Sequence, residues 1–307
     1  MRDEYWSADF SPLNYKWTKV RATQEKSLLS ILFGLGAAFG WGAADFTGGL
    51  ASRKTGAYRA VFYGEVIGIV ILLFIVMIAG EPLPNIRVWM LAMLAGALGT
   101  TGLMLLYHSM TLGLMSIATP VSALLAAALP ILVGGFKEGL PQGMTFIGFA
   151  FALLAVWMIS QGEGGVTNIL AHLSDLKLPL LAGIGFGSYF VVMHEATRTG
   201  ATIWPMVASR SGGIILVILY MFITRASWKV HPAAWPMITF NGLLDICGNS
   251  FFILAGQAGR LDVAAVLSSL YPGATVMLAW IFLKERLTRN QWIGIVSALI
   301  AILLMTM

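Results

Sequence analysis

The stretch FKEGLPQGMTFIGFAFALLAVWMI, residues 136–159, returns near the end of the chain as LKERLTRNQWIGIVSALIAILLM, residues 283–305. Glu138 aligns with Glu285, which lies 147 positions later. Each copy places a charged turn before an apolar run that is long enough to cross a bilayer as one helix. The two copies indicate that the chain is built from two related halves.

Further matches follow the same alignment. Pairs at an offset of 146 residues are Trp89 and Trp235, Gly96 and Gly242, Gly102 and Gly248, Gly113 and Gly259, and, after a one-residue insertion, Gly148 and Gly294. Nearer the start of each half, RKTGA around Gly56 matches TRTGA around Gly200 at an offset of 144 residues. Because the offsets are nearly equal along the chain, the repeat extends over each half and not only over its last helix.

The composition indicates that these halves lie in lipid. Of the 307 residues, 58% are hydrophobic and 11% are charged, and the mean hydropathy is +0.82, whereas soluble domains carry about 25% charged residues. Apolar windows of roughly membrane-spanning length lie at residues 28–50, 57–79, 88–110, 115–134, 142–160, 178–194, 203–223, 234–257, 262–283 and 290–306. We therefore predict an all-α polytopic membrane protein with about ten transmembrane helices.

Each half contains five predicted spans. Because five is an odd number, the second half enters the membrane from the opposite side, which gives two inverted five-helix repeats, an arrangement typical of secondary transporters. The repeats are expected over residues 28–160 and 178–307, after a polar N-terminal tail over residues 1–27 that lacks the apolar core of a signal peptide. The Lys and Arg residues divide equally between the two sides, so charge does not predict the orientation.

The opening GWGAADFTGGLASRKTG, residues 40–56, and the closing FLKERLTRNQWIGIVSALIAILLM, residues 282–305, resemble the drug/metabolite transporter superfamily, specifically its ten-span proteins with two EamA-type halves. The chain departs from that pattern at KEGLPQG in the first half and in lacking a late Gly in the last span. The resemblance implies an inner (plasma) membrane location, both termini in the cytoplasm and a central cavity between the halves. It also implies export of amino acids, related small metabolites or drugs.

The function predicted from these features is secondary transport of a small-molecule substrate by alternating access, with proton coupling as one energy source. An uptake permease is the main alternative. An intramembrane enzyme is less favoured, because the sequence has no HExxH and no GxSxG motif. A channel is a further, less favoured alternative. We expect no cofactor and no metal site, and no nucleic-acid partner because the basic residues are scattered between the spans. The lipid bilayer is the other expected partner.

Two charged residues within the predicted spans are the first candidates for a site, because an ionisable group at mid-bilayer costs roughly 2.5 to 3.5 kcal/mol. Glu65 lies about eight residues into the second span and Arg210 about seven into the seventh. In inverted repeats they approach the midplane from opposite faces at similar depth. We therefore predict that they form an ion pair, which either breaks during transport or holds the halves together. A further alternative is that Arg210 receives a substrate carboxylate.

Other polar candidates have alternative roles. Asp45, near the end of the first span, can bind a substrate ammonium or a proton, or serve as a helix-end or packing residue. Asp245 and Asn249 are spaced one helical turn apart and form a polar stripe with Asn241. Such a stripe lines a cavity or forms hydrogen bonds between helices.

Aromatic and histidine side chains complete the candidate set. Aromatic rings that can line a substrate cavity, or instead pack against lipid and neighbouring helices, are Trp41, Tyr107, Tyr189, Tyr271 and Trp280. His108 and His194 can relay protons or anchor helix ends. Pro120, Pro130 and Pro272 lie in the fourth and ninth spans, where they either break both helices near the site or merely kink them.

Overall fold

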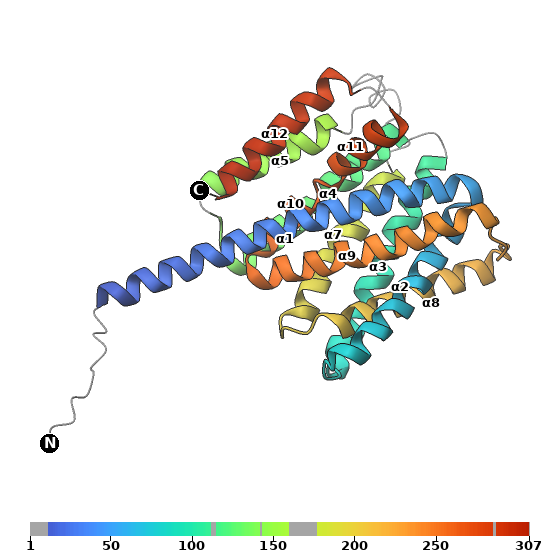
Figure 1. The fold of residues 1–307 in the computed structure, drawn as a ribbon, viewed down its shortest axis with the longest axis horizontal. Coiled ribbons are helices and arrows are strands. Elements are labelled where there is room, and N and C mark those ends of the chain that lie inside the picture. Colours follow the sequence, from blue (N-terminus) through green and yellow to red (C-terminus); the bar gives the residue numbers. More distant parts are fainter. Residues whose placement is uncertain (1–11, 112–114, 142, 160–176, 285–286, 307) are drawn as a thin grey trace.

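The computed structural model describes residues 12–111, 115–141, 143–159, 177–284 and 287–306. The described residues contain helices and no strand (Figure 1). The helices are α1 (Pro12–Thr55), α2 (Ala57–Ala79), α3 (Ile86–Thr111), α4 (Met115–Glu138), α5 (Gly143–Ile159), α7 (Lys177–Thr197), α8 (Ile203–Ile223), η2 (Pro232–Ala234), α9 (Trp235–Ala258), α10 (Leu261–Ser268), α11 (Tyr271–Leu283) and α12 (Arg289–Thr306).

The helices follow the predicted hydropathy windows. Seven helical segments are long and apolar enough to cross a membrane, and three shorter apolar helices lie at Val121–Lys137, Gly143–Ile159 and Arg289–Met305. Every predicted window coincides with a helix, although the ninth consists of two, α10 and α11. Large apolar side chains such as Met77 and Phe222 are more than 80% exposed. Apolar side chains on the exterior suit contact with lipid. Helices also suit lipid, because they satisfy their own backbone hydrogen bonds. The prediction of an all-α multi-pass membrane protein is confirmed.

Helix α1 begins at Pro12, so the second part of the stretch expected to be a polar tail is helical. Figure 1 shows that the early turns of α1 extend well beyond the other helices. Residues 1–11 lie outside the described residues.

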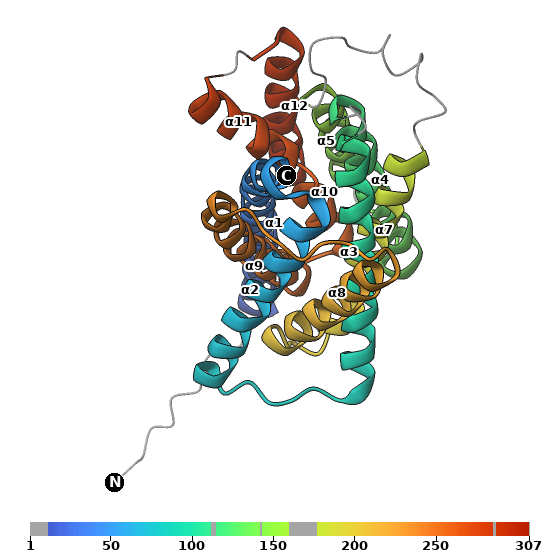
Figure 2. The ribbon, with the colours of Figure 1, turned by 90° about the vertical axis from the view of Figure 1, so that its right-hand side faces the viewer.

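The helices pack with the two-fold relation that the repeat predicts. Helix α7 is the repeat counterpart of α1, and α3 is that of α9; α1 packs against α9, and α7 packs against α3. Helices α10 and α11 together are the counterpart of α4; α4 packs against α7, and α10 and α11 pack against α1. Helix α3 packs against α8 as its counterpart α9 packs against α2. Two further pairs, α2 with α8 and α5 with α12, each join a helix to its own counterpart, and α5 and α12 run side by side in Figures 1 and 2. Contacts between the repeats therefore form most of the interior.

The glycines that align between the halves lie at equivalent helix crossings. A Cβ atom on Gly96 of α3 would lie 1.8 Å from the Ser209 carbonyl oxygen of α8, and one on Gly242 of α9 would lie 2.8 Å from the Gly64 carbonyl oxygen of α2. In the same way, Gly148 of α5 faces α12, and its counterpart Gly294 faces α5. Small residues allow helices in lipid to approach closely and to gain dispersion energy. The aligned glycines are therefore packing residues.

The connection before the second helix of each repeat contains a glycine with nearly the same φ angle. Gly56 precedes α2 with φ of 90°, and Gly200 precedes α8 with φ of 89°. Side chains rarely adopt this conformation, so both turns favour glycine. The match between RKTGA and TRTGA thus reflects a glycine of positive φ in both connections, although the connection is one residue long in the first half and five residues long in the second.

The prolines act differently in the two counterpart spans. Helix α10 ends at Ser268 and α11 begins at Tyr271, so that Pro272 lies in the first turn of α11, where a backbone N–H is not needed. Helix α4 continues from Met115 to Glu138 through positions 120 and 130. The expectation of a broken helix is therefore confirmed for the ninth span. In the fourth span the helix is continuous, which leaves the alternative of a kink, because a helix in lipid tolerates proline where its neighbours satisfy the freed backbone groups.

Candidate functional site

A cavity of about 120 Å³ lies between the two repeats. It is larger than the roughly 30 Å³ that one water molecule occupies, so it accommodates several waters or a small solute. Its lining residues come from α1, α2, α3 and α4 of the first repeat and α7, α8, α9 and α11 of the second: Trp41, Asp45, Glu65, Gly96, Gly99, Thr100, Leu103, Ala126, Phe186, Tyr189, Phe190, Met206, Ser209, Arg210, Asp245, Asn249 and Tyr271.

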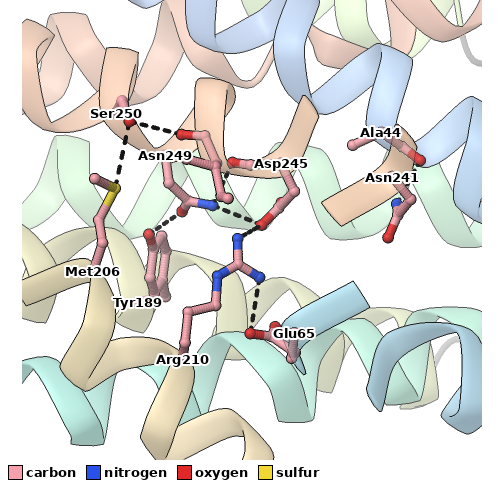
Figure 3. A network of polar contacts seen from close by, with 10 residues as sticks. Ala44, Glu65, Tyr189, Met206, Arg210, Asn241, Asp245, Asn249 and Ser250 are labelled. Atoms are coloured by element: carbon pink, nitrogen blue, oxygen red, sulfur yellow. Dashed lines mark hydrogen bonds and ion pairs between the residues drawn. The ribbon is translucent and has the colours of Figure 1, made fainter. Parts of the chain in front are cut away.

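Arg210 lies between two carboxylates in the wall of this cavity. Its Nη1 atom donates to Oε2 of Glu65 at 2.8 Å, and its Nη2 atom donates to Oδ2 of Asp245 (Figure 3). The side chains of Arg210 and Glu65 are 8% and 12% exposed, whereas that of Asp245 is 28% exposed. The predicted contact between Glu65 and Arg210 is present, and the structure adds Asp245 as a second acceptor. One guanidinium thus joins α2 of the first repeat to α8 and α9 of the second.

Glycines make room for this guanidinium group. A Cβ atom on Gly68 of α2 would lie 3.1 Å from Nε and 3.2 Å from Cζ of Arg210. On the other side, a Cβ atom on Gly213 would lie 2.4 Å from Oγ1 of Thr100 and 3.6 Å from the Glu65 carboxyl carbon. The small residues that let α2, α3 and α8 approach therefore also set the space in which the ion pair forms.

The polar network continues from Asp245 along α9. Asn249 donates from Nδ2 to Oδ2 of Asp245 at 2.8 Å, and its Oδ1 atom accepts from the Tyr189 hydroxyl (Figure 3). Asn241 belongs to the same predicted stripe, but its Nδ2 atom donates to the Ala44 carbonyl oxygen at 2.7 Å. The stripe therefore divides, because Asp245 and Asn249 line the cavity whereas Asn241 joins α9 to α1.

Asp45 also lines the cavity, on α1. Its side chain is half-buried, and no hydrogen bond or ion pair to it occurs among the described residues. Tyr189, which the repeat places opposite Asp45, lines the same cavity from α7. The two counterpart positions thus contribute a carboxylate and a phenol to one space.

An aromatic group forms part of the cavity wall. The ring of Trp41 stacks on Phe190 with centroids 5.4 Å apart and an interplanar angle of 15°. It also packs against Phe252, which in turn contacts Phe190 at 4.7 Å. Aromatic pairs of this kind hold their rings in defined positions. The Trp41 side chain is therefore well fixed where it meets the cavity.

Several predicted candidates lie elsewhere. Tyr107 is only 4% exposed, its hydroxyl packs against Gly48 of α1, and it is not among the cavity-lining residues. His108 is exposed near the end of α3, beyond Leu103, the last residue of that helix in the cavity wall. Trp280 is 48% exposed on α11. Of the two roles open to these aromatics, the structure favours packing for both, because Tyr107 is buried between helices and Trp280 is half-exposed outside the lining.

The sequence reasoning missed some lining residues. Those that are polar but not ionisable, or apolar, include Thr100, Ser209, Phe186 and Met206. Ser209 carried a usable signal, since the repeat aligns it with Glu65. The others had none, because a neutral residue in an apolar helix is not distinguished by its cost in lipid. No group of three or more His, Cys, Asp or Glu residues that could hold a metal occurs in the described part of the chain.

Comparisons with known proteins agree with this architecture. The model of the EamA-like transporter family matches residues 28–161 and 175–307. Uncharacterized protein MJ1333.1 of Methanocaldococcus jannaschii is 37% identical over 93 residues, a match that covers 30% of this chain and 65% of that protein. A solved structure, named only "Crystal structure of protein", superposes with a TM-score of 0.72 at 16% identity, over 90% of this chain and 95% of that chain, which shows a shared fold. Since the two family matches cover most of the chain and separate its two halves, the protein belongs to the EamA-like transporter family.

Proposed function

We propose that this protein is a secondary transporter that exports a small metabolite, such as an amino acid, a related compound or a drug, across the inner membrane. The observation that carries this proposal is the position of Arg210, which is shared between Glu65 of one repeat and Asp245 of the other in the wall of a cavity between them. Charged groups in a transmembrane interior are rare and typically mark substrate or ion pathways.

The shared guanidinium offers a physical basis for alternating access. Glu65 and Arg210 come from counterpart helices, so a rocking motion of one repeat against the other alters the distance between them. Asp245 is the more exposed of the two acceptors. A substrate charge that neutralises Asp245 weakens its hold on Arg210, whereas the Glu65 contact remains. In this mechanism the occupancy of the cavity biases the relative position of the repeats.

Counterflow in vesicles tests the proposal. The purified full chain is reconstituted, loaded with an unlabelled candidate substrate, and assayed for uptake of the labelled compound against its gradient. Saturable counterflow supports a carrier, whereas a channel gives none. Candidates come from a growth screen against toxic amino acids, analogues and drugs. Protection of expressing cells relative to empty-vector cells supports export, and increased sensitivity supports an uptake permease instead.

Two conservative substitutions test the role of the ion pair in the same assay. Glu65→Gln removes the charge at nearly constant volume, and Arg210→Lys retains the charge but loses the planar group that contacts two acids at once. We expect both variants to fold and to lose most counterflow. Full counterflow in both would show that the pair only holds the repeats together.

A further inference from the structure

We infer that the cavity recognises its substrate through a protonated amine, with Asp45 as the counter-ion and the Trp41 ring beside it. The inference rests on the proposed function and specifies the class of substrate. It follows from the charges in the cavity wall, from the state of each carboxylate and from the aromatic side chain next to Asp45.

The charges in the wall favour a cation. The lining contains the three acidic residues Asp45, Glu65 and Asp245 and one basic residue, Arg210, and no Lys or His. The two Nη atoms of Arg210 already donate to Glu65 and Asp245. A substrate carboxylate would compete with these acids for Arg210 and would add a further negative charge. A positively charged group instead reduces the excess negative charge of the cavity.

Of the three carboxylates in the wall, Asp45 is the one with no hydrogen bond or ion pair to a described residue. Glu65 and Asp245 have Arg210, and Asp245 also accepts from Asn249. For Asp45 the described residues supply no hydrogen bond and no cation, although the side chain is half-buried in a membrane helix. An uncompensated charge in such a place is costly unless it is neutralised. A ligand that brings an ammonium group supplies the missing charge and three donors.

The aromatic surroundings fit the same group. Trp41 precedes Asp45 by one helical turn, so both side chains lie on one face of α1, and both line the cavity. The face of an indole ring attracts an organic cation within about 6 Å of its centroid. The packing of Trp41 against Phe190 and Phe252 holds the ring in place. A carboxylate beside a fixed indole is a recognition site for an alkylammonium group.

The rest of the wall sets the body of the ligand. Apolar side chains, including Leu103, Ala126 and Phe186, line the cavity along with the charged groups. The cavity of about 120 Å³ suits a small molecule. We therefore expect a small primary amine with an apolar body, and we do not expect a simple carboxylic acid to bind well.

Binding to the detergent-solubilised full chain tests this inference without transport. The probes are butylamine, butan-1-ol and butyrate, which share an apolar body but differ in charge. Their affinities are obtained from the concentration dependence of the melting temperature, because a ligand stabilises the state that it binds. We expect butylamine to bind more tightly than either of the others in the unmodified protein. Equal affinity for the three probes, or preference for butyrate, would overturn the inference.

Asp45→Asn tests the counter-ion, with Glu195→Gln as the matched control. Glu195 is an acid on α7 that is not among the cavity-lining residues and that pairs with Lys137. We expect Asp45→Asn to weaken butylamine binding by about 30-fold, as for removal of one partner of a buried charge pair, and Glu195→Gln to leave it unchanged. Unchanged butylamine affinity in Asp45→Asn would overturn the role of Asp45 as counter-ion. The binding preference of the unmodified protein decides the outcome if this variant does not fold.

The two proposals fail in different ways. Saturable counterflow of a substrate without an amine, together with no butylamine binding, would reject the amine site but support a carrier. Butylamine binding that depends on Asp45, in a protein without counterflow, would support the amine site but not the carrier.

Discussion

Two arginine clusters in this protein have opposite designs. Arg210 is shared by Glu65 and Asp245, which lie 145 and 35 residues away in the chain and on different helices. Arg260 instead pairs with Asp262, two residues away, through contacts of 3.1 Å from Nε and 2.8 Å from Nη2. Asp262 has no exposed surface, whereas the Arg260 side chain is 32% exposed.

The local cluster gives each charge several partners. Asp262 also accepts from the Val263 backbone N–H at 2.8 Å, at the start of α10, and Arg260 donates from Nη2 to the Gly139 carbonyl oxygen at 2.7 Å. The Arg260 cluster therefore stabilises the turn between α9 and α10 and holds it near the end of α4. The cavity of the Arg210 cluster also contains Asp45, which has no hydrogen bond or ion pair to a described residue. Its negative charge can be compensated by a ligand or by a conformational change. We therefore expect the Arg260 cluster to be structural and the Arg210 cluster to be functional.

The same substitution at both arginines is the strongest test of this contrast. Arg210→Met leaves two mostly buried carboxylates without a cation, so we expect the free energy of unfolding to fall by about 3–5 kcal/mol and counterflow to be lost. Unfolding in detergent and counterflow in vesicles measure the two effects. Little change in either would show that the cluster neither stabilises the fold nor takes part in transport.

Arg260→Met is expected to have a smaller effect. Asp262 keeps the Val263 N–H and the favourable start of α10, so we expect a loss of about 1–3 kcal/mol in the free energy of unfolding. Counterflow per folded molecule should stay normal. A loss of counterflow as complete as that of Arg210→Met would contradict the assignment of separate roles.

Gly68→Ala changes the space around the Arg210 guanidinium without changing any charge. The added Cβ atom would lie 3.1 Å from Nε of Arg210. We therefore expect slower counterflow and a fall of about 1 kcal/mol or more in the free energy of unfolding. Gly49→Ala is the control, because no atom lies within 4 Å of its Cβ position. It should leave counterflow intact and, as a helix substitution, stabilise slightly if at all. Equal effects of the two substitutions would remove the case for Gly68 as a spacer.

Glu81→Gln tests a charge that caps a helix and pairs with no cation in the described structure. The Glu81 carboxylate accepts from the backbone N–H groups of Thr202, Ile203 and Trp204 at 3.0–3.2 Å, which satisfies the start of α8. We expect the free energy of unfolding to fall by about 1 kcal/mol, as for loss of a helix cap. No measurable change would indicate that water replaces the carboxylate at this helix end.

Lys137→Ala is expected to have the smallest effect. Lys137 pairs with Glu195 at 3.2 Å, but its side chain is 56% exposed. Surface ion pairs contribute about 0–1 kcal/mol, so the melting temperature should hardly change, and less so at high salt. A destabilisation comparable with that of Arg260→Met would show that this pair is more buried in the membrane than its exposure suggests.

Much of the architecture was accessible from the amino-acid order, because a bilayer imposes one length and one polarity on each span. The apolar windows predicted α2 and α8 to the residue, and the aligned glycines predicted the repeat. The contact between Glu65 and Arg210 followed from depth and inverted symmetry alone. For α4 the sequence left both a broken and a kinked helix open, because the effect of a proline on a membrane helix depends on what packs around it.

The sequence by itself determined the number of spans, the repeat and the few costly charges, since each depends on residue type and spacing. Only the tertiary structure decided which of those charges meet, that Asp245 shares Arg210 while Asn241 turns to Ala44, and that Asp45 has no partner among the described residues. It also excluded Tyr107 and His108 from the cavity wall. The physical reason is that the depth of a residue follows from its position in a span, whereas its direction follows from how each helix rotates against its neighbours at the glycine crossings.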